Sequence, residues 1–105
     1  MSVLRRYEIF LPRRFNDGSP VPDDLIADTL LELRQRFGAV SSETQTTYGT
    51  WEYEGAEYRD DLVRVFVDVA DISANREFFQ DLKDRLKARF QQIEIWMTTY
   101  TIDVV

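Results

Sequence analysis

The chain has 105 residues, 44% of them hydrophobic and 30% charged, a length and composition that favour a single domain over residues 1–105. Cysteine and histidine are both absent, which excludes disulfides, thiol nucleophiles, thiolate zinc sites and catalysis by a Ser-His-Asp triad. The net charge of −6 disfavours binding to nucleic-acid phosphates, and no apolar stretch approaches the length of a membrane span. The N-terminus also lacks the apolar segment of a signal peptide, so we expect a cytoplasmic protein. We further expect no cofactor, no metal ion, and no nucleic-acid or membrane partner.

The first third of the chain predicts a strand, a loop and a helix. Residues 5–11 alternate in character, which is typical of a strand, and Pro12 ends the run. One side of this strand would carry Tyr7, Ile9 and Leu11, and the other side Arg6, Glu8 and Phe10. An Asp-Gly pair and two prolines then predict a loop. Apolar residues at helical spacing predict a helix that begins near Pro22 and ends at Gly38.

The middle of the chain predicts a β-hairpin. Residues 45–53 are rich in threonine and aromatic side chains, and the later run LVRVFVDV has valine at every second position. We place a type II′ turn at Gly55-Ala56, since this turn favours glycine first. That register would set Tyr53 opposite Tyr58 and Trp51 opposite Asp60. The valines at positions 63, 65, 67 and 69 would then form one apolar row facing the helices.

A second helix and a last strand complete the predicted elements. Ser73 or Asn75 can cap the helix, whose apolar stripe continues to Phe90. In the final segment, Ile93, Ile95 and Met97 would share one side, and Glu94, Trp96, Thr98 and Tyr100 the other. The order β-α-β-β-α-β predicts an α+β fold of the ferredoxin-like split type, with a four-stranded antiparallel sheet and both helices on one face.

The sheet face without helices is predicted to be the functional surface. Alternation in neighbouring strands is coupled, so the valine row on one face places rings and charges on the other. A contiguous apolar patch usually marks an interaction surface. The candidate interface or ligand-binding residues are Phe10, Trp51, Leu62, Arg64, Phe66, Asp68, Glu94, Trp96 and Tyr100.

Four interpretations of this face remain open. Two copies could pack sheet against sheet, as in the dimeric α/β barrels built from this fold, or the rings could enclose a small ligand with Arg64 binding an anion. Single-stranded RNA could stack on the rings, but the third β-segment carries acids where RNA-recognition sheets have basic and glycine residues. In the fourth interpretation, a loop or the C-terminal tail covers the face.

No catalytic residue and no metal ligand is identified. Without histidine, acid–base chemistry would need a tyrosine or a carboxylate of raised pKa. Burial beside the rings could raise the pKa of Asp68 or Glu94, whereas Arg64 would lower it. A CRISPR-adaptation nuclease of this fold holds metal with an aspartate at the end of its first strand, and Leu11-Pro12-Arg13 stands there instead.

Several segments together resemble a group of small uncharacterised bacterial proteins of about this length. They are NDGSPVP, GTWEYEG, YRDD and FFQDLKDRLKARFQQIEIW, and the resemblance extends over nearly the whole chain. It implies one compact domain and carries over no catalytic residue.

Our leading hypothesis from the sequence is a non-enzymatic interaction or regulatory module that self-associates as a homodimer through its aromatic sheet face. The alternative is a small-molecule-binding protein or small enzyme with a pocket between two such sheets. An unidentified protein partner would also fit the first hypothesis.

Overall fold

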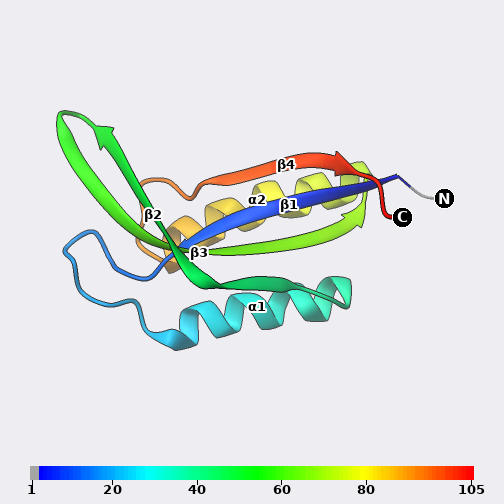
Figure 1. The fold of residues 1–105 in the computed structure, drawn as a ribbon, viewed down its shortest axis with the longest axis horizontal. Coiled ribbons are helices and arrows are strands. Elements are labelled where there is room, and N and C mark those ends of the chain that lie inside the picture. The colour runs from blue at the N-terminus through cyan, green and yellow to red at the C-terminus, as the bar shows by residue number, and fades with distance from the viewer. Residues whose placement is uncertain (1–2) are drawn as a thin grey trace.

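The computed structural model describes residues 3–105, except for the side chains of residues 44–48 and of residues 59 and 60. Its elements are, in chain order, β1 (Leu4–Pro12), α1 (Asp23–Phe37), β2 (Ser41–Tyr53), β3 (Ala56–Ala70), α2 (Ser73–Arg89) and β4 (Met97–Ile102). Figure 1 shows both helices running alongside the sheet, while the far end of the β2–β3 hairpin projects away from them. The predicted α+β class, with two helices and an antiparallel four-stranded sheet, is confirmed, and the arrangement resembles ferredoxin-like folds.

The sheet order is β2-β3-β1-β4, and each neighbouring pair is antiparallel. In the central pair, Tyr7 lies opposite Val67 and Ile9 opposite Val65. These four side chains are buried, as are Leu11 and the other two valines of the row. The predicted side-chain alternation of β1 and β3 is therefore confirmed, and it leaves the even-numbered residues of both strands on the open face.

One apolar core fills the space between the sheet and the helices. The helices contribute Leu33, Phe79, Leu82 and Leu86, and Phe90 follows the end of α2. The Tyr7 ring stacks on Phe79 with centroids 3.9 Å apart. Each large apolar side chain buried in this way stabilises the fold by about 1.5–3 kcal/mol, so the core fixes which sheet face remains open.

The two helices differ in how their ends are capped. Asp23 and Asp24 lie in the first turn of α1, and Gly38 ends it with a left-handed φ of 85°, both as the sequence predicts. The capping prediction for α2 is wrong, because Ile72 is the N-cap residue and no side chain caps it. Asn75 instead donates from Nδ2 to the carbonyl oxygen of Ala70, at 2.8 Å, and so ties the helix to the end of β3.

The hairpin turn lies one residue earlier than predicted. Glu54 and Gly55 both have positive φ, at 50° and 78°, which is the requirement of a type I′ turn rather than a type II′ turn. Tyr53 consequently pairs with Ala56, and Trp51 with Tyr58. This changes the predicted register by two residues, and an even change leaves every side chain on its predicted face.

Two strand boundaries also differ from the sequence prediction. β2 begins at Ser41, and its pairing with β3 is irregular between Ser42 and Thr46. β4 begins only at Met97, so the segment from Gln92 to Trp96 has no regular strand geometry. Alternation cannot be extrapolated through that segment, which matters for the candidate site below.

Candidate functional site

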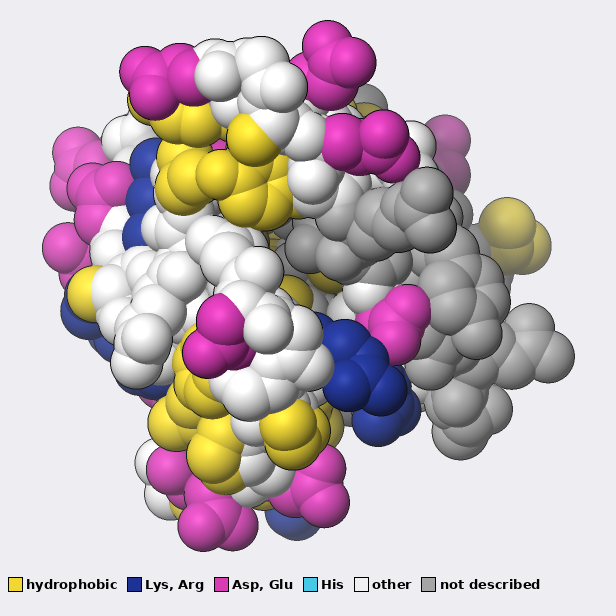
Figure 2. Space-filling model, turned by 90° about the vertical axis from the view of Figure 1, so that its left-hand side faces the viewer, with side chains coloured by type: hydrophobic (Ala, Val, Ile, Leu, Met, Phe, Trp, Pro, Cys, Tyr) yellow, Lys and Arg dark blue, Asp and Glu magenta, His cyan; other side chains and the backbone are white. Residues whose placement is uncertain are grey.

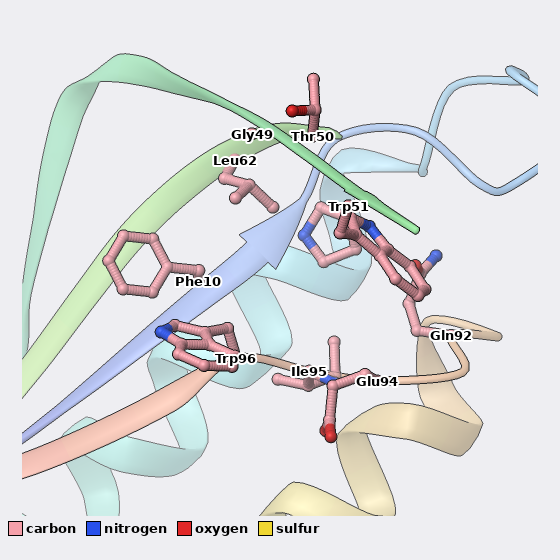
Figure 3. A pocket seen from close by; sticks show the side chains of 10 residues that line it. Phe10, Gly49, Thr50, Trp51, Leu62, Gln92, Glu94, Ile95 and Trp96 are labelled. Carbon is pink, nitrogen blue, oxygen red and sulfur yellow. The ribbon is translucent and has the colours of Figure 1, made fainter. Parts of the chain in front are cut away.

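An apolar pocket lies at the hairpin end of the open sheet face. It has a volume of about 350 Å³, and Figure 3 shows its walls. The lining residues are Phe10, Pro12, Gly49, Thr50, Trp51, Leu62, Gln92, Glu94, Ile95 and Trp96. Five of the nine residues predicted from the sequence to form the functional face thus line this pocket: Phe10, Trp51, Leu62, Glu94 and Trp96.

The walls of the pocket come from four separate parts of the chain. Phe10 stands near the end of β1, and its backbone N–H donates to the carbonyl oxygen of Trp96, at 3.0 Å. This bond continues the β1–β4 ladder beyond β4 and holds the two rings near each other (Figure 3). Leu62 lies opposite Pro12 on β3, and Trp51 reaches the pocket from β2.

The floor and the outer wall of the pocket differ in burial although they are neighbours in sequence. Ile95 is 2% exposed and belongs to the core, whereas Trp96 is 65% exposed. Trp51 is half-buried and stacks on Tyr58, with centroids 4.5 Å apart. The pocket therefore has a buried apolar base and two indole rings at its sides, one of them largely in solvent.

Gly49 gives the pocket part of its space. It lies within β2, its φ is not positive, and a Cβ atom there would meet Leu62 Cδ1 at 3.5 Å. Glycine inside a strand often marks a close approach by a ligand or another backbone. This rule is the signal by which the sequence could have indicated Gly49. The sequence prediction missed it, together with the lining residues Pro12, Thr50, Gln92 and Ile95.

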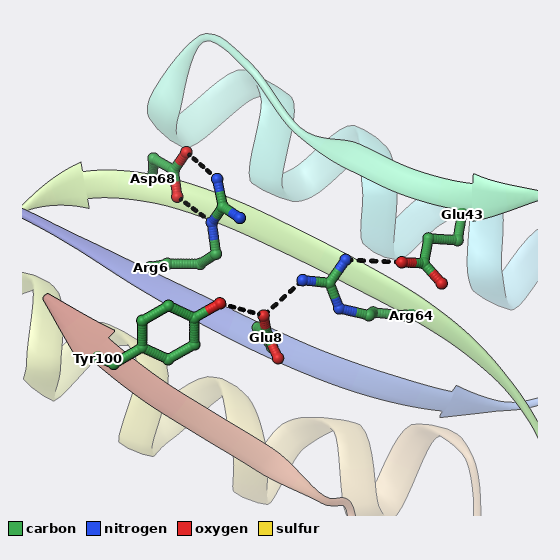
Figure 4. A network of polar contacts seen from close by, with 6 residues as sticks. All are labelled: Arg6, Glu8, Glu43, Arg64, Asp68 and Tyr100. Atoms are coloured by element: carbon green, nitrogen blue, oxygen red, sulfur yellow. Dashed lines mark hydrogen bonds and ion pairs between the residues drawn. The ribbon is translucent and has the colours of Figure 1, made fainter. Parts of the chain in front are cut away.

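The rest of the open face carries a network of ion pairs. Arg6 donates two hydrogen bonds to Asp68, at 2.7 and 2.9 Å. Arg64 donates to Glu8 at 2.5 Å and to Glu43 at 2.8 Å (Figure 4).

A tyrosine and a phenylalanine complete this network. The Tyr100 hydroxyl donates to the same Glu8 oxygen as Arg64, at 2.5 Å (Figure 4). The Phe66 ring lies beneath the network, with the guanidinium carbons of Arg6 and Arg64 4.5 and 4.4 Å from its centroid. The predicted residues Arg64, Phe66, Asp68 and Tyr100 thus form a polar region beside the pocket.

The ionisation of this polar region argues against acid–base chemistry at neutral pH. Hydrogen bonds from Arg64 and then Tyr100 lower the pKa of Glu8, despite its partial burial. The pKa of Arg64 is raised, chiefly by its hydrogen bond to Glu8. Both groups are therefore charged at neutral pH and compensate each other, and Arg64 already has two carboxylate partners.

The expected orientation of Glu94 on the open face is wrong, and its pKa, whose direction the sequence left open, is lowered. Its carboxylate points towards α2, where Oε1 lies 3.0 Å from Lys83 Nζ and 3.7 Å from Lys87 Nζ (Figure 3). Burial would raise the pKa of Glu94, but the Lys83 contact and the backbone N–H of Ile95 outweigh it and lower that pKa. The physical reason is that residue 94 precedes β4, so strand alternation does not set its direction.

Figure 2 shows the end of the molecule that carries the hairpin. Hydrophobic side chains there form separate patches, with acidic side chains at their margins. In the part of the chain that the structure describes, no three acidic side chains form a group that could hold a metal ion. No described helix is long and apolar enough to cross a membrane.

Comparisons with known proteins reveal a likeness of structure. No protein-family model and no curated protein matches this chain. A phage SAM lyase in complex with S-methyl-5′-thioadenosine has a TM-score of 0.71 at 15% sequence identity, covering 99% of this chain and 92% of the lyase. A phage SAM lyase in its apo state gives 0.63 at 18% identity, covering 97% and 90% of the two chains. CutA1 from Oryza sativa gives 0.59 at 12% identity, covering 99% and 84%. At these identities the likeness shows a shared fold.

Proposed function

We propose that the protein binds a small molecule with a flat ring in the apolar pocket of the open sheet face. The observation that carries the proposal is a cavity of about 350 Å³ walled by Phe10, Trp51 and Trp96. Ligand pockets of proteins begin at about 300 Å³ and are lined mainly by apolar and aromatic groups. Aromatic walls favour flat ligands, because offset or edge-on ring contacts add roughly 0.5–1.5 kcal/mol beyond area burial.

The polar region supports ring binding over anion binding. Arg64 donates to both Glu8 and Glu43, and Arg6 binds Asp68 through two hydrogen bonds. A ligand would have to displace a carboxylate before either guanidinium could bind it. The sequence-based idea of Arg64 as an anion-binding group is therefore less favoured than contact with the rings of the pocket.

The phage SAM lyase supplies the first probe. Its bound S-methyl-5′-thioadenosine is an uncharged molecule with a flat purine and an apolar thioether end. A pocket walled by indole and phenyl rings matches that chemistry. We therefore choose S-methyl-5′-thioadenosine, adenosine and S-adenosylmethionine as probes, with indole as a flat ring unrelated to purines.

Tryptophan fluorescence measures binding directly, because the chain has two tryptophans and both line the pocket. We expect at least one of the four probes to change the tryptophan emission in a saturable manner. The same probe should raise the melting temperature as its concentration increases, since a ligand that binds the folded state stabilises it. The absence of both effects for all four probes would refute the proposed function.

A substitution of Gly49 locates the binding site. Gly49→Val should fill part of the pocket beside Leu62 without backbone strain, since residue 49 has no positive φ. We expect binding of the active probe to weaken about tenfold or more, while far-UV circular dichroism stays unchanged. Ala56→Val is the matched control, because it also adds a β-branched side chain to the hairpin but outside the pocket lining. Equal weakening by both variants would place the ligand elsewhere.

Self-association of the sheet face is a second candidate function. The specific observation in its favour is the 65% exposure of Trp96, with Tyr53 and Tyr100 also exposed at 44% and 43%. Large exposed apolar groups on one face are typical of interaction surfaces. A homodimer that covers Trp96 would also close the pocket between two sheets.

The test of this second candidate is the molar mass at several concentrations, measured by light scattering. We expect a homodimer for the wild type and a folded monomer for Trp96→Glu. If the wild type remains a monomer throughout the concentration series, self-association through this face is wrong. Ligand binding by the monomer would be unaffected by that result.

A further inference from the structure

We infer that the pocket discriminates by charge: it accepts uncharged ring compounds such as nucleosides and rejects the same compounds when they carry a phosphate. The inference rests on the proposed function and names the ligand class of that same pocket. It follows from where the charged groups around the pocket direct their atoms.

Among the side chains that the structure describes, no charged group is directed into the interior of the pocket. Among its lining residues only Glu94 is charged, and its carboxylate points towards α2 (Figure 3). Lys83 and Lys87 meet that carboxylate on the helix side and are absent from the lining. Within the described part of the chain, no lysine or arginine lines the pocket.

A cation next to the pocket on the open face, Arg64, is held away from it. Arg64 lies directly opposite Phe10 in the β1–β3 register. Its guanidinium, however, lies over the Phe66 ring, at 4.4 Å from the centroid, on the side away from Leu62. Glu8 and Glu43 hold it there through hydrogen bonds of 2.5 and 2.8 Å.

Two hydrogen-bond donors at the pocket are engaged as well. Gln92 Nε2 donates to the carbonyl oxygen of Phe90 at 3.0 Å, and the Phe10 N–H donates to Trp96. Within the part of the chain whose side chains are described, Gln92 Oε1 accepts no hydrogen bond. The polar rim therefore offers an acceptor, which suits a hydroxyl or amino group of a ligand.

A phosphate at this rim would lose water without gaining a cationic partner among the described lining residues. A buried or half-buried anion costs free energy unless a cation or several donors compensate it. An uncharged ribose or amine loses far less and can donate to Gln92 Oε1. The discrimination between neutral and phosphorylated compounds thus comes from the free-energy cost of desolvating the phosphate. Such a cost imposed on the competing ligand is a common basis of specificity.

The experiment compares adenosine with adenosine 5′-monophosphate, which differ by the phosphate alone. Tryptophan emission is excited outside the adenine absorption band, and S-methyl-5′-thioadenosine serves as a second neutral probe. We expect adenosine or S-methyl-5′-thioadenosine to bind at least about tenfold more tightly than the monophosphate. The difference should persist at high salt, because short-range desolvation is screened little.

A double variant tests whether the engaged arginine sets the preference. Glu8→Gln with Glu43→Gln removes both carboxylates around Arg64 and should reduce the difference between adenosine and its monophosphate several-fold. The matched control is Asp68→Asn with Asp71→Asn, which makes the same change in net charge beside Arg6 and Arg5. The control should leave the ratio of the two affinities unchanged, since neither arginine lies opposite the pocket.

The outcomes separate the two proposals. Equal affinity for adenosine and its monophosphate would overturn the charge discrimination and leave the proposed function intact. An equal shift in the ratio for the double variant and its control would assign discrimination to net charge and overturn the role of Arg64. If neither adenosine nor S-methyl-5′-thioadenosine binds while indole does, the pocket binds rings and the assignment to nucleosides is wrong. If no probe binds, both proposals fail.

Discussion

The two halves of the open sheet face differ in how they use their side chains. In the polar half, the two arginines form salt bridges with carboxylates: Arg6 binds Asp68, and Arg64 binds Glu8 and Glu43. In the apolar half, Trp96 is largely exposed beside a cavity of about 350 Å³. The charged side chains of the polar half are paired with one another, whereas the apolar half has exposed hydrophobic surface that a ligand or a partner can cover. The capacity to bind therefore lies with the rings.

The largest expected effect tests the boundary between the core and the apolar half. Ile95→Ala should destabilise the fold by about 3 kcal/mol, because a buried isoleucine loses its contacts and leaves a cavity. Trp96→Ala, one residue later, should change stability by no more than about 0.5 kcal/mol, since the ring is 65% exposed. Urea unfolding at neutral pH measures both. Similar losses for the two variants would show that Trp96 is part of the core and would remove the contrast between the two halves.

A smaller effect is expected when the polar half loses its central cation. Arg64→Met should destabilise the fold by about 2 kcal/mol, because Glu8 is only 13% exposed and would be left without a cation. Glu43 is more exposed than Glu8, so it should contribute little to this loss. Arg6→Met is the matched control and should cost less, since its partner Asp68 is 31% exposed. A gain in stability for Arg64→Met would mean that the network serves specificity rather than stability.

The smallest expected effect is a pH dependence of stability that arises in the polar half. The folded-state pKa of Glu8 is lowered, so its contribution is fully present above its unfolded pKa of about 4.3 and disappears as the pH falls through the folded value. Glu8→Gln should therefore make stability depend less steeply on pH below about 4.5 than it does in the wild type. Glu32 and Glu94 also have lowered pKa values, so part of the acid sensitivity should remain.

Urea unfolding at several acidic pH values gives the slopes for this comparison. Glu43→Gln serves as the control, since that carboxylate also contacts Arg64 but is more exposed. Identical slopes for the wild type and Glu8→Gln would contradict the assignment of this linkage to Glu8.

Much of the fold could be predicted because the alternation of apolar residues in β1 and β3 is compatible with only one assignment of side chains to the two sheet faces. Alternating residues such as Ile9 and Val65 can be buried together only if Phe10 and Arg64 lie on the other face. The error in the hairpin register did not affect which side chains share a face, because a register change of two residues keeps every residue on the same face. Trp51 therefore reached the predicted face although its predicted partner was wrong.

The candidate site could be predicted only in part. Phe10, Trp51, Leu62 and Trp96 share a face by alternation, and the sequence indicated that face. Their meeting around a cavity depends on the projecting hairpin and on the irregular segment before β4, which periodicity does not describe. Glu94 lies in that segment, and its direction follows from the lysines of α2.

The sequence by itself determined the order of the elements, the face that the helices cover and the aromatic character of the other face. These features follow from side-chain periodicity, which is local and is enforced by burial of one core. Only the tertiary structure decided that Arg64 is engaged by Glu8 and Glu43 and that Gly49 opens space beside Leu62. Such pairings join residues far apart in the chain, and their geometry is set by strand register and twist rather than by any local pattern.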